Sequence, residues 1–130
     1  MAQQEIEMIL TRQLASYLAI PIFLVDPDGN LLYCNELAER VLGGVLDEID
    51  DLPMSRWSTM FHQQDEQGNL IPPEELPLVT AVRTRKPASR TFMIKGMDGM
   101  RRQIHVVGVP LIGQADRFLG AVGFFWEMSE

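Results

Sequence analysis

The chain has few of the residues that most often mark a metal-binding, disulfide-bonded or secreted protein. It contains one cysteine, Cys34, and two histidines, His62 and His105, among 130 residues. A single cysteine excludes an internal disulfide and a cysteine-based zinc site. This cysteine usage fits a reducing compartment, so we expect a cytoplasmic protein. The first residues also lack the basic start and the apolar run of a signal peptide.

Basic residues and long apolar runs are scarce as well. Eleven lysines and arginines stand against eighteen acidic residues, which gives a net charge of −7. Phosphate binding needs a concentrated basic surface, so we expect no direct nucleic-acid partner. The longest apolar run, residues 118–126, is too short to cross a bilayer, so we expect no membrane span. The length and the apolar fraction indicate one soluble globular domain.

The most informative segment is residues 21–35, PIFLVDPDGNLLYCN. Two apolar runs flank Asp28-Gly29, and a glycine there supplies the positive φ of a tight hairpin. Asn35 stands before ELAERVL, where its side chain can accept hydrogen bonds from the first free N–H groups of a helix. The segment predicts strands over 22–26 and 31–34, followed by a helix over 36–42 that ends at two glycines.

The remaining elements come in blocks of one type. Apolar residues recur at helical spacing over 5–18, which predicts an amphipathic N-terminal helix. The chain then predicts short helical turns over 45–61, a loop over 62–73 and a helix over 74–85. Three strands follow, over 91–95, 102–111 and 118–126, with a second Asp-Gly turn at Asp98-Gly99. Helices and strands are thus grouped in separate blocks along the chain, which predicts an α+β domain with an antiparallel sheet.

Several of these strands are apolar on both faces. Residues 22–25 are all apolar, and residues 104–109 alternate two apolar sets around His105. A sheet with one face in water alternates more cleanly, so we expect both faces to be covered. The middle helices can cover only one face, which leaves the other to the N-terminal helix, a second copy of the chain, or both. We therefore expect a homodimer, with an interface formed by Ile6, Ile9, Leu10, Leu14, Tyr17, Phe23 and Val25.

The ordered set of segments resembles a PAS domain of the bacterial sensor type. The family's opening strand pair resembles PIFLVDPDGNLLYCNELAERVLG, in which Asp26, Gly29 and Asn35 stand at its usual polar and glycine positions. Its loop and long helix resemble DEQGNLIPPEELPLVTAVRTRKP, and its fourth strand resembles MDGMRRQIHVVGVPLIG. Its final strand resembles FLGAVGFFWEMSE, with Glu127 where the family often has aspartate. The resemblance covers residues 18–127, almost the whole chain.

The resemblance implies a fold and a domain division. The expected fold is a PAS-like five-stranded antiparallel sheet with short helices on one face and an N-terminal amphipathic helix. We expect residues 1–18 to form that dimerisation or capping helix, residues 19–127 the PAS domain, and residues 128–130 the start of a linker or the C-terminal end. Because such domains usually continue into an effector, we expect this chain to be the N-terminal piece of a longer one.

The resemblance also implies a function in signal transduction. The chain would bind a small, mostly apolar or aromatic ligand in its core and relay the change through dimerisation. The effector, in cis or in a partner protein, would be a histidine kinase of a two-component system, a cyclic-nucleotide enzyme or a transcription regulator. The alternative is a ligand-free dimerisation and protein-interaction module whose core is filled.

A ligand pocket would lie between inward strand positions and the helices. We expect its lining to comprise Leu24, Leu31, Tyr33, Leu42, Trp57, Met60, Val79, Val82, Phe92, Ile94, Ile104, Val106 and Phe124. Eight methionines favour an adaptable pocket, and glycines of the central strands could leave room. The polar groups that could orient a ligand are Tyr33, Ser58 and Arg83.

Catalytic and cofactor motifs are missing. Haem-binding members of the family use a histidine on the long helix, and residues 74–85 contain none. Light-sensing flavin members use a cysteine in an asparagine-cysteine-arginine motif, whereas Cys34 precedes Asn35 and is expected to be a buried residue on the sheet's outer face. Haem and a covalent flavin adduct are therefore disfavoured, while a non-covalent flavin stays open. No metal site, phosphate loop or nucleophile with its base is present, so we expect no enzyme.

Overall fold

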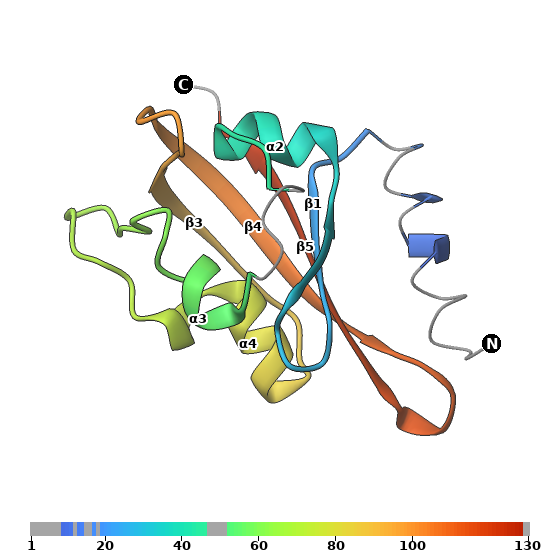
Figure 1. The fold of residues 1–130 in the computed structure, drawn as a ribbon. Helices are drawn as coiled ribbons and strands as arrows, with labels where there is room; N and C mark the ends of the chain where they lie inside the picture. Colours follow the sequence, from blue (N-terminus) through green and yellow to red (C-terminus); the bar gives the residue numbers. More distant parts are fainter. Residues whose placement is uncertain (1–8, 12, 15–16, 18, 47–51, 129–130) are drawn as a thin grey trace.

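The structure, a computed structural model, describes residues 9–11, 13–14, 17, 19–46 and 52–128 (Figure 1). Its elements run in the order β1 (Ile22–Val25), β2 (Leu31–Cys34), α2 (Glu36–Leu42), α3 (Met54–Trp57), η1 (Pro73–Glu75), α4 (Pro77–Thr84), β3 (Ala88–Lys95), β4 (Arg101–Ile112), η2 (Gln114–Asp116) and β5 (Phe118–Glu127). The strands form one sheet in the order β2-β1-β5-β4-β3, and every neighbouring pair is antiparallel. The predicted five-stranded antiparallel sheet is confirmed.

The helices α2, α3 and α4 lie on one side of this sheet (Figure 1). The described residues of the N-terminal segment lie on the other side, and residues 9–11, 13, 14 and 17 are helical. The predicted N-terminal helix is therefore present at the positions that the structure describes. Residues 5–8, which include Ile6, lie outside them. No helix among the described residues is long and apolar enough to span a membrane.

The opening hairpin and its helix follow the sequence prediction closely. Asp26 Oδ1 accepts the backbone N–H groups of Asp28 and Asn30, each at 2.9 Å, and Gly29 takes a φ of 91°. Asn35 caps α2, since its Oδ1 accepts the Ala38 N–H at 2.9 Å. The helix ends at Gly43 in the left-handed conformation, as glycine at this position favours. These short-range interactions are set by residue types that the sequence shows directly.

The helix predicted over 74–85 is interrupted. The structure has the 3-10 turn η1, then the extended residue Leu76 (φ −76°, ψ 138°), then α4 from Pro77. Leu76 precedes a proline, whose ring disfavours the helical conformation of the residue before it. Pro77 instead begins a new helix, where its missing N–H costs nothing. The prediction of one continuous helix was wrong for this reason.

The sheet carries one apolar cluster on each face. The larger cluster lies under the helices, and the smaller one is built on Ile22, Leu24, Leu119 and Val122, all at most 1% exposed. Both faces of the sheet are therefore apolar, as predicted, and the smaller cluster is buried within a single chain.

The predicted orientation was wrong for β1, for Tyr33 and Cys34 of β2, and for the end of β5, while Leu31 of β2 packs against the core as predicted. Phe23 and Val25, expected at a dimer interface, lie in the helix-covered core, while Leu24, Tyr33 and Phe124, expected in the pocket, belong to the cluster on the opposite face. Cys34, expected outside, is also in the helix-covered core. The pairing explains the reversal, because Phe125 lies opposite the inward-facing Val106. Paired residues share a face, so a one-residue shift of register inverts a strand.

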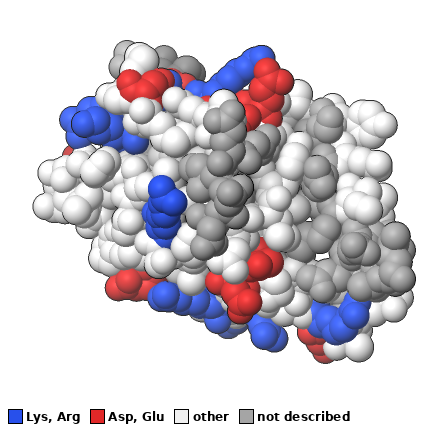
Figure 2. All heavy atoms as spheres, viewed as in Figure 1, with Lys and Arg blue, Asp and Glu red and all other residues white. Residues whose placement is uncertain are grey.

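In Figure 2, the charged side chains that the structure describes lie mainly near the edges of the face, with both signs interspersed and a basic side chain nearer the middle. The acidic residues Asp47, Glu48, Asp50 and Asp51 lie outside the described residues. Among the arginines, Arg102 is not simply solvated. Its side chain is 13% exposed, donates to Asp98 Oδ2 at 2.6 Å and lies 3.9 Å from a Glu127 carboxylate oxygen. This cluster joins the turn between β3 and β4 to the end of β5.

Candidate ligand-binding site

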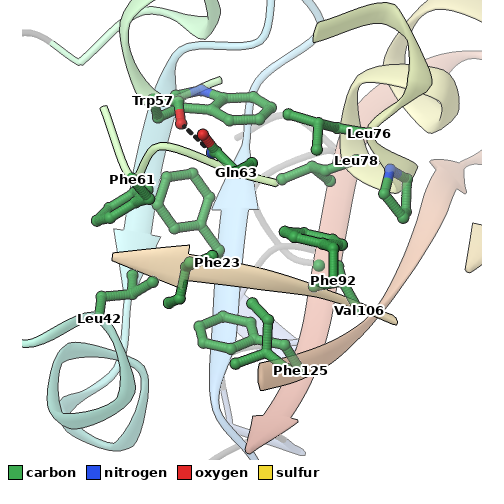
Figure 3. Close-up of a pocket in the computed structure, with 14 residues that line it drawn as sticks. Phe23, Leu42, Trp57, Phe61, Gln63, Leu76, Leu78, Phe92, Val106 and Phe125 are labelled. Carbon is green, nitrogen blue, oxygen red and sulfur yellow. Dashed lines mark hydrogen bonds between the residues drawn. The ribbon is translucent and has the colours of Figure 1, made fainter. Parts of the chain in front are cut away.

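A cavity of about 70 Å³ lies between the sheet and its helices (Figure 3). A site for one water needs about 10–15 Å³, so this space exceeds what one water occupies. Its wall draws on β1, β3, β4 and β5, on α2, α3 and α4, and on the loop after α3. The lining residues are Phe23, Leu42, Trp57, Phe61, Gln63, Leu76, Pro77, Leu78, Phe92, Ile94, Ile104, Val106, Gly123 and Phe125.

The predicted lining residues divide into three groups. Six of them line the cavity, namely Leu42, Trp57, Phe92, Ile94, Ile104 and Val106. Four more belong to or pack against the same core without lining it, namely Leu31, Met60, Val79 and Val82. The other three lie on the opposite face, namely Leu24, Tyr33 and Phe124. That the first six contact a ligand stays a prediction.

The sequence analysis missed Phe23 and Phe125 because it assigned the wrong face to their strands. Phe61 ends the segment of predicted helical turns, and Gln63 lies at the start of the predicted loop. In neither place does a periodic pattern indicate which residues point inward. An isolated β-bridge between Gln64 and Met93 fixes the position of this loop. The Gln64 N–H donates to Met93 O at 2.9 Å, and the Met93 N–H donates to Gln64 O at 3.0 Å. This long-range contact with β3 holds the loop against the sheet.

Two lining side chains carry polar atoms, and they are linked to each other. The Trp57 indole N–H donates to Gly29 O at 2.7 Å, which satisfies the indole and holds α3 on the β1–β2 turn. The Gln63 Nε2 donates to Trp57 O at 3.0 Å (Figure 3). The Gln63 Oε1 is buried and has no hydrogen-bond partner, and it is the one such side-chain atom among the described residues.

Aromatic rings make up much of the cavity wall, and two of them are in direct contact. Phe23 and Trp57 meet edge to face, with ring centroids 5.4 Å apart and planes inclined by 63°. Phe61, Phe92 and Phe125 complete the aromatic part of the wall. Among the residues that the structure describes, the lining has no ionisable side chain, so these residues offer an occupant aromatic faces and edges but no charge partner. Such a site favours uncharged ligands.

The polar residues expected to orient a ligand lie elsewhere. Tyr33 packs on the opposite face, Ser58 is buried at the end of α3 without lining the cavity, and Arg83 is exposed. Cys34 is 2% exposed on the helix side of β2. His105 is on the other side of β4, 5.1 Å from the Trp126 ring centroid. Among the described residues, no group of three or more His, Cys, Asp and Glu side chains is placed to hold a metal.

The remaining predicted interface residues are apolar and exposed. Ile9, Leu10, Leu14 and Tyr17 are 44%, 57%, 56% and 87% exposed. A shallow apolar groove also lies on the outer face, lined by Ala19, Ile20, Pro21, Val107, Phe124 and Trp126. The prediction that the N-terminal residues form a dimer interface is compatible with this exposure and stays a prediction.

Comparison with known proteins finds similarity in structure only. The sequence matches no protein-family model and no curated protein. The structure is similar to the PAS domain of a protein from Colwellia psychrerythraea, with 19% identity, a TM-score of 0.64 and coverage of 93% of this chain and 97% of that one. It is similar to the PAS domain of the fruit-fly ELK potassium channel, with 11% identity, a TM-score of 0.72 and coverage of 96% and 98%.

A third similar structure is the LOV domain of the blue-light-activated histidine kinase EL346 from Erythrobacter litoralis. It has 21% identity and a TM-score of 0.63, with coverage of 85% of this chain and 97% of that one. At these identities the likeness establishes the fold. The strand order, the helices on one face and these structural matches together confirm the resemblance in sequence: this chain has the PAS-domain fold.

Proposed function

We propose that this chain is a sensory module that binds a small, mostly apolar or aromatic ligand in the cavity under its helices. The PAS fold supports a role in signalling, since solved structures of the same fold include the LOV domain of a blue-light-activated histidine kinase. By analogy, the change on binding passes to an effector in cis or in a partner, either a histidine kinase, a cyclic-nucleotide enzyme or a transcription regulator. The expected location is the cytoplasm, which agrees with a single, buried cysteine.

The observation that carries this proposal is the unfilled space inside an otherwise close-packed core. Protein interiors leave few voids larger than a water molecule. Here Leu42 and Leu78 from the helices, Leu76 just before α4 and five aromatic rings surround about 70 Å³ without filling it. The side chains around this space lack contacts on one side. A bound apolar molecule that supplies those contacts would stabilise the folded state by mass action.

Tryptophan fluorescence tests the proposal, because one tryptophan lines the cavity and the other does not. Trp57 is 5% exposed in the wall, and Trp126 is 43% exposed on the outer face. In the Trp126→Phe variant, a cavity ligand should change the emission of Trp57. In the matched Trp57→Phe variant, the same ligand should leave the emission of Trp126 unchanged.

The ligand itself is sought by native mass spectrometry of the purified chain and by thermal shift across single-ring and two-ring compounds. A bound mass or a melting temperature that rises with concentration supports ligand sensing. Bare protein, no thermal shift and no Trp57 response would reject it in favour of a filled-core interaction module.

The exposed apolar residues of the N-terminal segment and the outer-face groove favour a second role in dimerisation. We infer that Ile9 and Leu14 contact a second copy of the chain, since a monomer leaves both largely in water. The double variant Ile9→Glu plus Leu14→Glu should then be a monomer by light scattering, while the unmodified chain has twice that mass. An unchanged mass in the double variant would reject this interface. The dimer is also the route by which the sensory module would reach its effector.

A further inference from the structure

The cavity wall contains one free hydrogen-bond acceptor in apolar surroundings. Gln63 is 7% exposed, and its Oε1 has no partner although it is buried. A buried amide oxygen left unpaired has lost its hydrogen bonds to water without replacement, so native structures rarely tolerate it without a reason. The atom belongs to a residue that lines the cavity.

The orientation of the Gln63 amide follows from its neighbour. Trp57 O lies 3.0 Å from Nε2, and a carbonyl oxygen can only accept. Exchanging the two amide atoms would place Oε1 against this carbonyl, two acceptors facing each other without a proton. The amide must therefore present its N–H to Trp57 O and keep its oxygen as the unpaired atom.

The backbone around Gln63 holds the side chain in place. The Ile71 N–H donates to Gln63 O at 2.9 Å, and Gln64 exchanges two hydrogen bonds with Met93 of β3. Since the side chain is also tied to Trp57 O, the acceptor is anchored from both ends. Anchoring of this kind lowers the ordering cost when a ligand binds.

We propose that Gln63 Oε1 accepts a hydrogen bond from the ligand, and that the ligand is a small, uncharged, aromatic molecule with one N–H or O–H donor. This inference rests on the proposed sensing function and names the chemistry that the cavity selects. The aromatic wall suits an aromatic occupant, because rings attract one another edge to face or offset. A charged ligand would find no charge partner there, because the described lining residues include no ionisable group.

The size of the cavity sets the scale of the ligand. An apolar cavity of about 150 Å³ binds benzene, and this cavity measures about 70 Å³. It therefore fits a ring smaller than benzene in its present state. A water at the same acceptor would need two to four polar partners, and the lining side chains offer only the Gln63 oxygen.

Pyrrole and furan form a matched pair of probes, since both are five-membered aromatic rings and only pyrrole carries an N–H. Dissociation constants are measured by NMR titration of the purified chain, following the Trp57 indole N–H. Pyrrole should bind about tenfold more tightly than furan, the effect of one net hydrogen bond.

The variant Gln63→Leu removes the acceptor and should reduce the ratio of the furan and pyrrole dissociation constants from about ten to about one. Gln63→Met, which keeps a flexible linear side chain, serves if the leucine variant does not fold. The control Gln67→Leu changes an exposed glutamine of the same loop and should keep the preference. In the unmodified chain, the Gln63 side-chain amide resonances should shift on addition of pyrrole and not of furan.

The outcomes separate this inference from the proposed function. Equal affinities for pyrrole and furan in the unmodified chain would overturn the role of Gln63 and leave a ligand-binding cavity in place. A preference that persists in the Gln63 variants would also overturn it, because the donor would then bind another group. Failure of both pyrrole and furan to bind would overturn the inference, whereas the sensing function is rejected by bare protein, no thermal shift and no Trp57 response.

Discussion

Gly108 and Gly123 lie directly opposite each other on the central strands β4 and β5. Both face the N-terminal turn of α4. A Cβ built on Gly108 would lie 2.5 Å from Pro77 O, and one on Gly123 would lie 3.4 Å from Leu78 Cδ2. The two glycines therefore have different roles, since the first allows close approach of a helix backbone and the second leaves space at the cavity wall.

Replacing Gly108 by alanine should destabilise the chain. The new methyl group would meet backbone atoms of Pro77 and Leu78, which cannot rotate away as a flexible side chain can. Overpacking of this kind costs about 1–3 kcal/mol. The free energy of unfolding, measured by urea denaturation with fluorescence, should fall by that amount in Gly108→Ala. A variant as stable as the unmodified chain would show that α4 can move off the sheet without cost.

Replacing Gly123 by alanine should have the opposite effect on stability and a direct effect on the cavity. Its added methyl group meets the Leu78 side chain at 3.4 Å and Phe23 O at 3.8 Å, both at ordinary van der Waals distance. Alanine in place of glycine within a strand stabilises by about 0.5–1 kcal/mol. Urea denaturation should therefore show equal or higher stability, while the affinity for pyrrole falls because the methyl group enters the space. Unchanged affinity would mean that the ligand does not approach β5.

The sequence predicted local features better than it predicted which face of the sheet each strand presents. The Asp28-Gly29 hairpin, the Asn35 cap and the Gly43 end of α2 depend on contacts a few residues apart, and all three are as predicted. The amphipathic strand β4 was also oriented correctly, because His105 marks its polar side.

The orientation of β1 could not be derived in the same way. All four of its residues are apolar and buried, so alternation carries no information about the face. Only the pairing of Phe23 with Gly123 and of Leu24 with Val122 decides it, and such pairing across about 100 residues leaves no local signal. Gln63 was missed for the same reason, because its place at the cavity depends on the bridge between Gln64 and β3.

Asn35 joins the first strand to the first helix of the domain, and its loss should be costly. Oδ1 accepts the backbone N–H groups of Ile22 at 3.1 Å and Ala38 at 2.9 Å, and Nδ2 donates to Ile20 O at 2.8 Å. Asn35→Ala removes a cap worth about 1 kcal/mol. It also leaves the Ile22 N–H buried without this partner, which costs about 1–3 kcal/mol of stability.

The expected loss for Asn35→Ala is therefore about 2–4 kcal/mol in the free energy of unfolding, measured by urea denaturation. Asn69→Ala, at an exposed loop position, is the matched control and should change stability by less than about 0.5 kcal/mol. A loss in Asn35→Ala no larger than in the control would contradict the structural role assigned to this side chain.

Asp98 should make the stability of the chain depend on pH in the acid range. Two charge-assisted hydrogen bonds from Arg102, at 3.0 Å and 2.6 Å, and one from the Met100 N–H lower the pKa of Asp98 from 3.8 to about 2. A carboxyl whose pKa is lower in the folded state contributes its full stability above its unfolded pKa. That contribution is lost as the pH falls from about 4 to about 2.

The measurement is the free energy of unfolding of the unmodified chain and of Asp98→Asn between pH 6 and pH 2. The unmodified chain should be the more stable one by a constant amount above about pH 5, and the difference should shrink as the pH falls toward 2. In an Arg102→Gln background, the same Asp98→Asn comparison should lose most of its pH dependence, because the hydrogen bonds from Arg102 are the largest cause of the lowered pKa. A difference that stays constant down to pH 2 would show that Asp98 gains no more from its partners in the folded chain than in the unfolded one.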